Sequence, residues 1–292
     1  MTDRVLVTGA TGFLGRALTA RLLHDGHTVA VVQRSQSPAA DFRCIGIEWE
    51  GDAATLVEAV EGRKPRIIFH LATHFVSQHQ TEDLPRLIEA NVTLGTALLE
   101  GAQKAGSTVV VTGSAWQHLN GASYLPVSLY AATKQALFDI AVYYKNSGVD
   151  VRELTFFDTY GPSDHRGKLV SLLLDAAATG RTLDMSSGQQ LIDLLYVSDA
   201  IEALVAAALF PEPSSIEASR FVARSGQPLS VRDLVKGIED AIETRISVRW
   251  GQRSDRPNEM RTNWEFGIPV PGWLPEVDLR QGIQTCWAER SQ

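Results

Sequence analysis

The chain has 292 residues, of which 44% are hydrophobic, and this is enough for a large globular core. Its formal net charge is −7 at pH 7, so no global positive field attracts nucleic acid or an anionic membrane. The two cysteines, Cys44 and Cys286, lie far apart and outside any metal-binding spacing, which indicates free thiols and no metal site. The first apolar run, 4–9, is too short for a signal peptide or a membrane span, so we expect a soluble, cytoplasmic protein.

Short apolar runs alternate with amphipathic stretches through the first half of the chain. Runs such as "RVLVTG" and "STVVVTGS" are continuously apolar, which is typical of strands buried on both faces. Their alternation with helices predicts a parallel sheet covered on both sides. The predicted strands are 4–9, 27–34, 42–49, 65–72, 107–114 and 149–157, and the predicted helices are 13–25, 53–62, 82–104 and 128–147.

The alternation weakens after residue 162. Further predicted elements are helices over 167–179, 198–209 and 230–244, strands over 189–197 and 219–223, and a tail over 250–275 rich in Pro, Trp and Arg. We therefore predict a doubly wound α/β Rossmann-type fold. Residues 1–162 form its dinucleotide-binding domain, and 163–292 form mostly a smaller substrate-binding lobe that is interleaved with the end of the sheet.

Glycine recurs at every third position in "TGATGFLG", between the first strand and the first helix. Gly9, Gly12 and Gly15 allow a tight turn, a close approach of backbone to phosphate, and close packing of helix on strand. The free N–H groups and the positive dipole end of the helix then hold a pyrophosphate. The spacing is GxxGxxG, and its position in a βαβ series predicts a dinucleotide site.

The end of the second strand indicates which dinucleotide binds. An NAD site usually has an acid there for the ribose hydroxyls, but this chain has Gln33, Arg34 and Ser35. An arginine can pair with a 2′-phosphate, and the two neighbours can add hydrogen bonds. We therefore favour NADP(H), with NAD(H) as the alternative.

The segment "YAATK" places Tyr130 and Lys134 four residues apart on one face of a predicted helix. A free tyrosine is too weak an acid to exchange protons readily near neutrality. We expect the ammonium of Lys134, together with an oxidised nicotinamide, to lower the pKa of Tyr130. Ser114 ends the fifth predicted strand, where its hydroxyl can bind the same substrate oxygen. These three residues are the predicted catalytic set for a carbonyl/alcohol pair.

With these motifs the chain resembles the extended short-chain dehydrogenase/reductase family, in the epimerase/dehydratase branch that acts on nucleotide sugars. The resemblance covers nearly the whole chain. It is carried by "TGATGFLG", "HLA" (70–72), "NVTLGT" (91–96), "TGSA" (112–115), "YAATK" (130–134), "DTYGP" (158–162), "YVSD" (196–199) and "GWLPEVDLRQGI" (272–283).

The resemblance implies a set of cofactor-binding positions. Lys134 would bridge the nicotinamide ribose and Tyr130, Asp52 would lie near the adenine, and Asn91 would support the site. The other implied cofactor contacts are Thr11, Gly12, Phe13 and Leu14 at the turn, Leu71, Ala72 and Thr73 beside the ribose, Thr112 of "TGSA", and Phe156 and Phe157 beside the nicotinamide.

The chain departs from the family pattern at three places. Thr155 and Asp158 stand where members often have Arg and Asn, so an acid occupies the place of an amide that usually meets the sugar nucleotide. Ile192 replaces a frequent arginine. Nucleotide-sugar 4,6-dehydratases carry an Asp-Glu pair after the catalytic hydroxyl residue, whereas this chain has Ala115-Trp116-Gln117, and this argues against dehydration.

Two reactions fit these residues. An epimerase returns the hydride to the substrate, keeps its cofactor and usually prefers NAD, whereas a ketoreductase must exchange NADP for NADPH. Arg34 and Ser35 favour the ketoreductase, and the resemblance suggests an NDP-4-keto-6-deoxyhexose as the substrate. A non-catalytic NADP-binding sensor is a third, disfavoured hypothesis, because such proteins tend to lose the Tyr or the Lys.

The substrate's diphosphate needs cations, and its sugar needs a pocket. Candidate phosphate ligands are Arg166, Lys168, Arg253 and Arg256, and candidate sugar contacts are His74, Ser114, Trp116, His118 and Asp158. The helices predicted at 82–104 and 128–147 resemble those that pair in this family, so we expect a homodimer through a four-helix bundle. Packing of the first of them within the monomer is the alternative.

Overall fold

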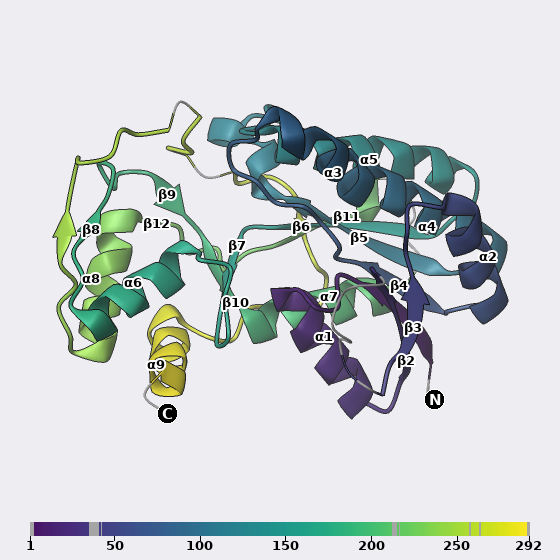
Figure 1. Ribbon diagram of the computed structural model, residues 1–292, viewed down its shortest axis with the longest axis horizontal. Coiled ribbons are helices and arrows are strands. Elements are labelled where there is room, and N and C mark those ends of the chain that lie inside the picture. Colours follow the sequence, from purple (N-terminus) through teal and green to yellow (C-terminus); the bar gives the residue numbers. More distant parts are fainter. Residues whose placement is uncertain are drawn as a thin grey trace.

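An eight-stranded parallel sheet forms the larger lobe of the molecule (Figure 1). The computed structural model describes residues 3–34, 41, 43–211, 215, 217–256, 258–262 and 264–290. In spatial order the strands are β14 (Ile268–Pro269), β11 (Arg220–Ala223), β6 (Val151–Phe156), β5 (Thr108–Ser114), β4 (Ile67–His70), β1 (Arg4–Thr8), β2 (Thr28–Gln33) and β3 (Ile45–Glu48). Chain order reverses between β1 and β4, where a doubly wound sheet binds its ligand, so the predicted Rossmann-type fold is confirmed.

Helices cover both faces of this sheet, because the strands are apolar on both sides. Figure 1 shows α1 (Phe13–His24) and α7 (Val197–Leu209) against one face. The opposite face packs on α2 (Ala53–Arg63), α4 (Leu94–Ala105) and α5 (Leu129–Asn146). Side-chain oxygens start several helices, since Asp52 accepts the Ala54 N–H at α2 and Ser128 accepts the Ala131 N–H at α5.

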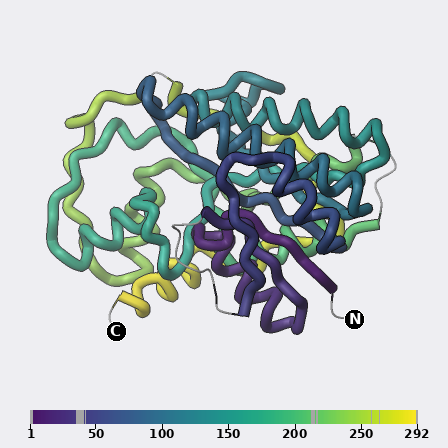
Figure 2. The backbone as a smooth tube through the Cα atoms, turned by 45° about the vertical axis from the view of Figure 1, so that its right-hand side comes forward, coloured from purple at the N-terminus to yellow at the C-terminus, as the bar shows by residue number. Residues whose placement is uncertain are grey.

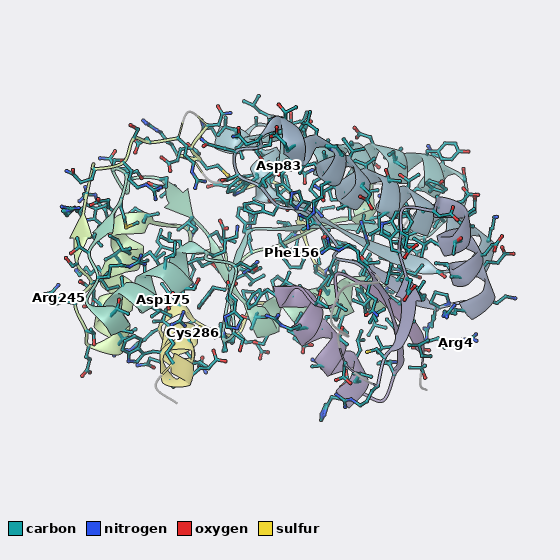
Figure 3. All side chains as sticks on the ribbon, in the orientation of Figure 1. Arg4, Asp83, Phe156, Asp175, Arg245 and Cys286 are labelled. Carbon is teal, nitrogen blue, oxygen red and sulfur yellow. The ribbon has the colours of Figure 1, made fainter. Side chains whose placement is uncertain are left out.

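The smaller lobe has its own apolar core, formed by α6 (Leu169–Thr179), α8 (Val231–Ile242) and α9 (Leu279–Arg290). Three short strand pairs surround it: β7 (Asp158–Tyr160) with β10 (Leu194–Tyr196), β9 (Leu191–Ile192) with β12 (Leu229–Ser230), and β8 (Leu183–Asp184) with β13 (Val248–Arg249). Of the elements after residue 162, α7, β11 and β14 belong to the sheet lobe. Both cysteines are free, and Cys286 is buried on α9 (Figure 3).

The chain after β13 returns from the smaller lobe to the sheet across the top of the molecule (Figure 2). It touches the sheet lobe on the way, since Asn258 Nδ2 donates to the Val127 carbonyl and the Arg261 N–H donates to Asn120 Oδ1. It then supplies β14 at the sheet edge. The sequence did not predict β14, nor helix α9 at the end of the chain.

Two predicted elements are wrong in detail. The predicted helix 82–104 consists of a 3-10 turn, α3 (Leu84–Ile88), a π-helical turn (Glu89–Thr93) and α4. The predicted strand 189–197 divides into β9 and β10, because Asp193 between them turns its buried carboxylate to the N–H groups of Ser225 and Gly226. No helix in the described part of the chain is long and apolar enough to cross a membrane.

Candidate active site

The glycine turn lies between β1 and α1, as predicted, and it has no room for side chains. Gly9 has φ +71°, and a Cβ there would lie 2.7 Å from the backbone nitrogen of Ala72. A Cβ on Gly15 would lie 1.9 Å from the Gly9 carbonyl oxygen. Gly12 precedes α1 without a side-chain cap, so the first N–H groups of the helix remain available to a ligand. This turn fits a pyrophosphate.

A cavity of about 600 Å³ opens from this turn along the carboxyl ends of the strands. Phe156, which ends β6 near the middle of the molecule, lies on its wall (Figure 3). The predicted cofactor residues on the wall are Gly9, Thr11, Gly12, Phe13, Leu14, Gly15, Gln33, Arg34, Leu71, Ala72, Thr73, Thr112, Tyr130, Lys134, Phe156 and Phe157. The structure thus brings together residues from three strands, from the loops that follow β1 and β4, and from two helices, and the wall they form fits a dinucleotide.

Two predicted cofactor residues, Asp52 and Asn91, are not on this wall. Asp52 is exposed, and its carboxylate accepts hydrogen bonds from Ala54 N and Thr55 Oγ1 at the start of α2. Asn91 lies behind the wall. Ser35 falls outside the described residues. Trp49, which the sequence did not single out, lines the cavity instead and donates from its indole to Glu89 Oε1.

Arg34 is exposed at the end of β2, on the cavity wall. It forms no hydrogen bond or ion pair with any other residue that the structure describes. Beside it, Gln33 Oε1 is buried and has no hydrogen-bond partner among those residues. The free guanidinium is suited to an anionic group, and the Gln33 oxygen, which only accepts hydrogen bonds, is suited to a donor such as a ribose hydroxyl.

The catalytic candidates meet at the deep end of the cavity. Tyr130 occupies the first turn of α5 and Lys134 the next turn, while Ser114 ends β5. Lys134 is only 2% exposed, and its Nζ donates to Thr112 Oγ1 at 3.4 Å. Thr112 Oγ1 in turn donates to the carbonyl of His70.

Burial dominates the electrostatics of this site. It lowers the pKa of Lys134 from 10.5 to about 8. It also raises the pKa of Tyr130 from 10.0 to about 12, against the hydrogen bonds of Thr73 and Ser114 that lower it. The expected lowering of the Tyr130 pKa by Lys134 is therefore wrong for the ligand-free chain, since desolvation of the phenolate outweighs the nearby cations. At neutral pH, Tyr130 is a neutral proton donor.

The π-helical turn explains how Asn91 supports the site. Its side chain is fully buried and accepts from Thr73 Oγ1 and the His74 N–H. It also donates to the His74 carbonyl and to Thr133 Oγ1. Asn91 therefore ties the loop after β4 to α5 one residue before Lys134. The sequence motif indicated a supporting role, but only the fold shows these partners.

A second cavity of about 1020 Å³ joins the first and extends between the lobes. Trp116, Arg253 and Arg256 lie on its wall, and both arginines are exposed. Neither guanidinium is paired with a described residue. The residues shared by both cavities are Phe75, Asp158, Thr159, Arg166 and Lys168.

Several predicted substrate residues are held differently from expectation. Arg166 is paired with Asp164 and lies over the Phe13 ring, 4.2 Å from its centroid, so its charge is already neutralised on the cofactor side. His74 lines the cofactor cavity but not the second one. His118 lines neither, because its ring stacks on Trp264 at 3.8 Å and bonds to the Ser123 carbonyl. The sequence missed Phe75, which packs edge-on to Tyr130.

Comparisons with known proteins identify the family to which this fold belongs. The NAD dependent epimerase/dehydratase family model matches residues 5–217. A UDP-glucose 4-epimerase of Mycolicibacterium smegmatis is 30% identical, with 96% of each chain covered. A CDP-abequose synthase of Yersinia pseudotuberculosis is 26% identical over 69% of this chain and 72% of the relative. Among solved structures, MoeE5 in complex with UDP-glucuronic acid and NAD superposes with a TM-score of 0.83 at 26% identity, covering 99% of this chain and 100% of that one. The resemblance inferred from the motifs is confirmed.

The buried ammonium should make the ligand-free protein's stability depend on pH. Lys134 titrates near 8 in the folded state and near 10.5 when unfolded, so below pH 8 it lowers the free energy of unfolding by about 3 kcal/mol. This cost disappears as the pH rises from 8 to 10.5. Lys134→Met should therefore be more stable than the unaltered protein at pH 7 in urea unfolding, with the difference shrinking toward pH 10.

Lys236→Met is the matched control, because Lys236 is exposed on α8 and should show no such pH-dependent difference. A Lys134→Met protein that is less stable than the unaltered chain at pH 7 would show that the ammonium is stabilised where it lies.

Proposed function

Because the chain belongs to the NAD dependent epimerase/dehydratase family and is a nicotinamide-dependent enzyme, we propose that it reduces a nucleotide-linked keto sugar with NADPH. An NDP-4-keto-6-deoxyhexose is the first candidate substrate. The observation that carries the proposal is the position of Tyr130, a neutral phenol beside Ser114 on the wall of the first cavity. Its ring packs on Phe75, which lines both this cavity and the larger one that holds the arginines. The solved structure of MoeE5 contains both UDP-glucuronic acid and NAD, and this supports the proposal that the two cavities of this chain bind a nucleotide sugar and a dinucleotide.

The residues of this chain account for the proton chemistry of a reduction. When bound, the nicotinamide supplies the hydride. Tyr130 donates its phenolic proton to the carbonyl oxygen of the substrate. The high pKa of Tyr130 keeps this proton on the phenol, and so available for transfer, at neutral pH. Ser114 orients that oxygen by a hydrogen bond. The nearby Lys134 ammonium stabilises the phenolate that remains, and its contact with Thr112 fixes its position.

The segment after Ser114 has no group for eliminating water. Ala115 is buried, and the side chain of Gln117 is occupied, because its Oε1 accepts the Ser114 N–H and its Nε2 donates to Gln135. No carboxylate therefore follows the catalytic hydroxyl. This supports reduction or epimerisation over dehydration.

On the wall of the second cavity, Arg253 and Arg256 are proposed to bind the substrate's diphosphate. Both are exposed on the wall and carry unpaired guanidinium groups, as far as the described residues show. Arginine binds phosphate oxygens through two parallel hydrogen bonds.

A nucleotide-sugar epimerase that retains NAD is the second candidate. It is favoured by the relative named UDP-glucose 4-epimerase, which matches over 96% of this chain. Both reactions use the same phenol, so the cofactor balance separates them.

The first test incubates the protein with NADPH or NADH and a panel of nucleotide-4-keto-6-deoxysugars while the cofactor absorbance is followed. We expect oxidation of NADPH by at least one of them, and Tyr130→Phe should lower kcat by about 10²- to 10⁴-fold because it removes the proton donor. Binding of NADPH should remain. Interconversion of sugars without net cofactor consumption would instead establish the epimerase, and nucleotide-dependent partner binding without any turnover would establish a sensor.

The second test concerns the cofactor. If Arg34 binds a 2′-phosphate, Arg34→Asp should raise the Kd for NADP⁺ by at least about tenfold, since it replaces an attractive charge by a repulsive one. The Kd for NAD⁺ should change little. Arg245→Asp is the control, because Arg245 is 92% exposed in the smaller lobe. An unchanged ratio of the two constants would contradict the proposed preference for NADP(H).

A homodimer through α3, α4 and α5 is part of the same proposal. Ile88 at the end of α3 is 49% exposed and Tyr143 on α5 is 67% exposed, although both are apolar. The two helices lie side by side on the outer surface (Figure 1), which suits a helix-bundle interface.

The protein should therefore sediment as a dimer, and the double variant Ile88→Asp/Tyr143→Asp should sediment as a monomer, because buried carboxylates would disrupt the interface. Leu209→Asp serves as the control, since Leu209 is also exposed but lies on α7. A monomeric unaltered protein would contradict the proposal.

A further inference from the structure

We propose that Asp158 and Lys168 form an oppositely charged pair that binds hydroxyl groups of the sugar ring, so that the enzyme selects an uncharged sugar over an acidic or an amino sugar. This inference rests on the proposed function and names the class of sugar that the site accepts. It also moves Lys168 from the diphosphate, where the sequence had placed it, to the sugar.

Both residues lie where the two cavities meet. Asp158 begins β7 and Lys168 directly precedes α6, and each lines both cavities. Across the described chain, neither side chain has a hydrogen-bond or ion-pair partner. The two groups nevertheless act on each other electrostatically, since Asp158 opposes the burial that lowers the pKa of Lys168. Because each side chain lines both cavities, a ligand group at the junction of the cavities lies within reach of both charges.

The position of the ammonium identifies the part of the substrate it meets. Lys168 Nζ lies 3.9 Å from the centroid of the Phe75 ring and 5.8 Å from that of Trp116. The Phe75 ring in turn packs edge-on to Tyr130, with 5.0 Å between centroids. A single aromatic ring therefore separates the ammonium from the catalytic phenol. The group bound by Lys168 belongs to the reacting sugar.

A hydroxyl is the ligand group that satisfies both partners. An ionised carboxylate only accepts hydrogen bonds and an ammonium only donates them, whereas a hydroxyl donates and accepts. A sugar carboxylate would pair with Lys168 but would be repelled by the negative charge of Asp158. A sugar ammonium would pair with Asp158 but would be repelled by the positive charge of Lys168. Arg166 does not shift this balance, because Asp164 neutralises it. Trp116, on the wall of the second cavity, supplies apolar surface for the C–H groups of a sugar ring.

Calorimetric titration tests the inference with four probes: UDP, UDP-glucose, UDP-glucosamine and UDP-glucuronic acid. The unaltered protein should bind UDP-glucose more tightly than the other three. Lys168→Met should leave the Kd of UDP unchanged and weaken UDP-glucose by about tenfold, while it shifts the preference toward UDP-glucosamine. Asp158→Asn should shift the preference toward UDP-glucuronic acid. Lys168→Arg, which keeps the charge, should keep the discrimination against UDP-glucosamine.

Matched controls are Lys236→Met and Asp240→Asn, which make the same two exchanges at exposed positions of α8. They should leave all four dissociation constants unchanged. Urea unfolding of each variant verifies that a change in affinity does not come from loss of the fold.

Three outcomes would overturn the inference. If Lys168→Met weakens UDP and UDP-glucose by the same factor, the ammonium binds the diphosphate. If neither variant shifts the order of the three sugar nucleotides, or if the unaltered protein binds UDP as tightly as UDP-glucose, the pair does not bind the sugar. Turnover of keto sugars with NADPH is measured separately from these affinities. If no turnover is found, the proposed function is wrong. If turnover is found but the affinities do not shift as expected, only the inference about Asp158 and Lys168 is wrong.

Discussion

The rest of the site depends on one buried lysine ammonium. Among the residues that the structure describes, no carboxylate contacts it. Lys134 is held there by one hydrogen bond to Thr112, and its lowered pKa records the cost of burial. Its neighbours must therefore avoid a second positive charge. His70 meets this condition, because complete burial and the nearby Lys134 lower its pKa to about 3 and keep it neutral. The neutral ring bonds to Thr8 Oγ1, which also accepts the Ala72 N–H.

These bonds link the proposed catalytic residues to the glycine turn. Thr8 ends β1 and immediately precedes Gly9, while Thr112 on β5 donates to the His70 carbonyl on β4. The carboxyl ends of three neighbouring strands are thus joined by side chains as well as by the sheet. Such coupling places phenol, ammonium and glycine turn in fixed positions relative to one another, which proton transfer requires. The structural cost at Lys134 is retained where it serves chemistry.

Local patterns in the sequence were enough for much of the fold and for the centre of the site. The glycine spacing and the pair Tyr130 and Lys134 depend on contacts within a turn or a helix, so their geometry follows from residue order. The sign of the Tyr130 pKa shift does not, because it depends on how completely other elements cover the phenol. The π-helical turn at Asn91 was missed for the same reason, since its partners come from the loop after β4 and from α5. Phe75 lies in a loop that carries no periodic signal, and Trp49 directly follows β3, where a strand pattern does not show that its side chain reaches the cavity.

The charges of the site differ between the walls that belong to one cavity alone and the middle that the two cavities share. Unpaired arginines lie on the separate walls, with Arg34 at the end of β2 in the first cavity and Arg253 and Arg256 in the second. In the middle each charge has a counterpart, because Asp164 neutralises Arg166 and Asp158 balances Lys168. An extended anion with charge at both ends and a neutral centre fits this pattern, as a dinucleotide phosphate and a sugar nucleotide do when their reacting parts meet. Tyr130 and Lys134 are more deeply buried than this shared middle, and burial is the main cause that raises the pKa of Tyr130. Asp158 raises that pKa further and Arg166 lowers it, so the charges of the middle act on the phenol in opposite directions while burial keeps it protonated for its transfer.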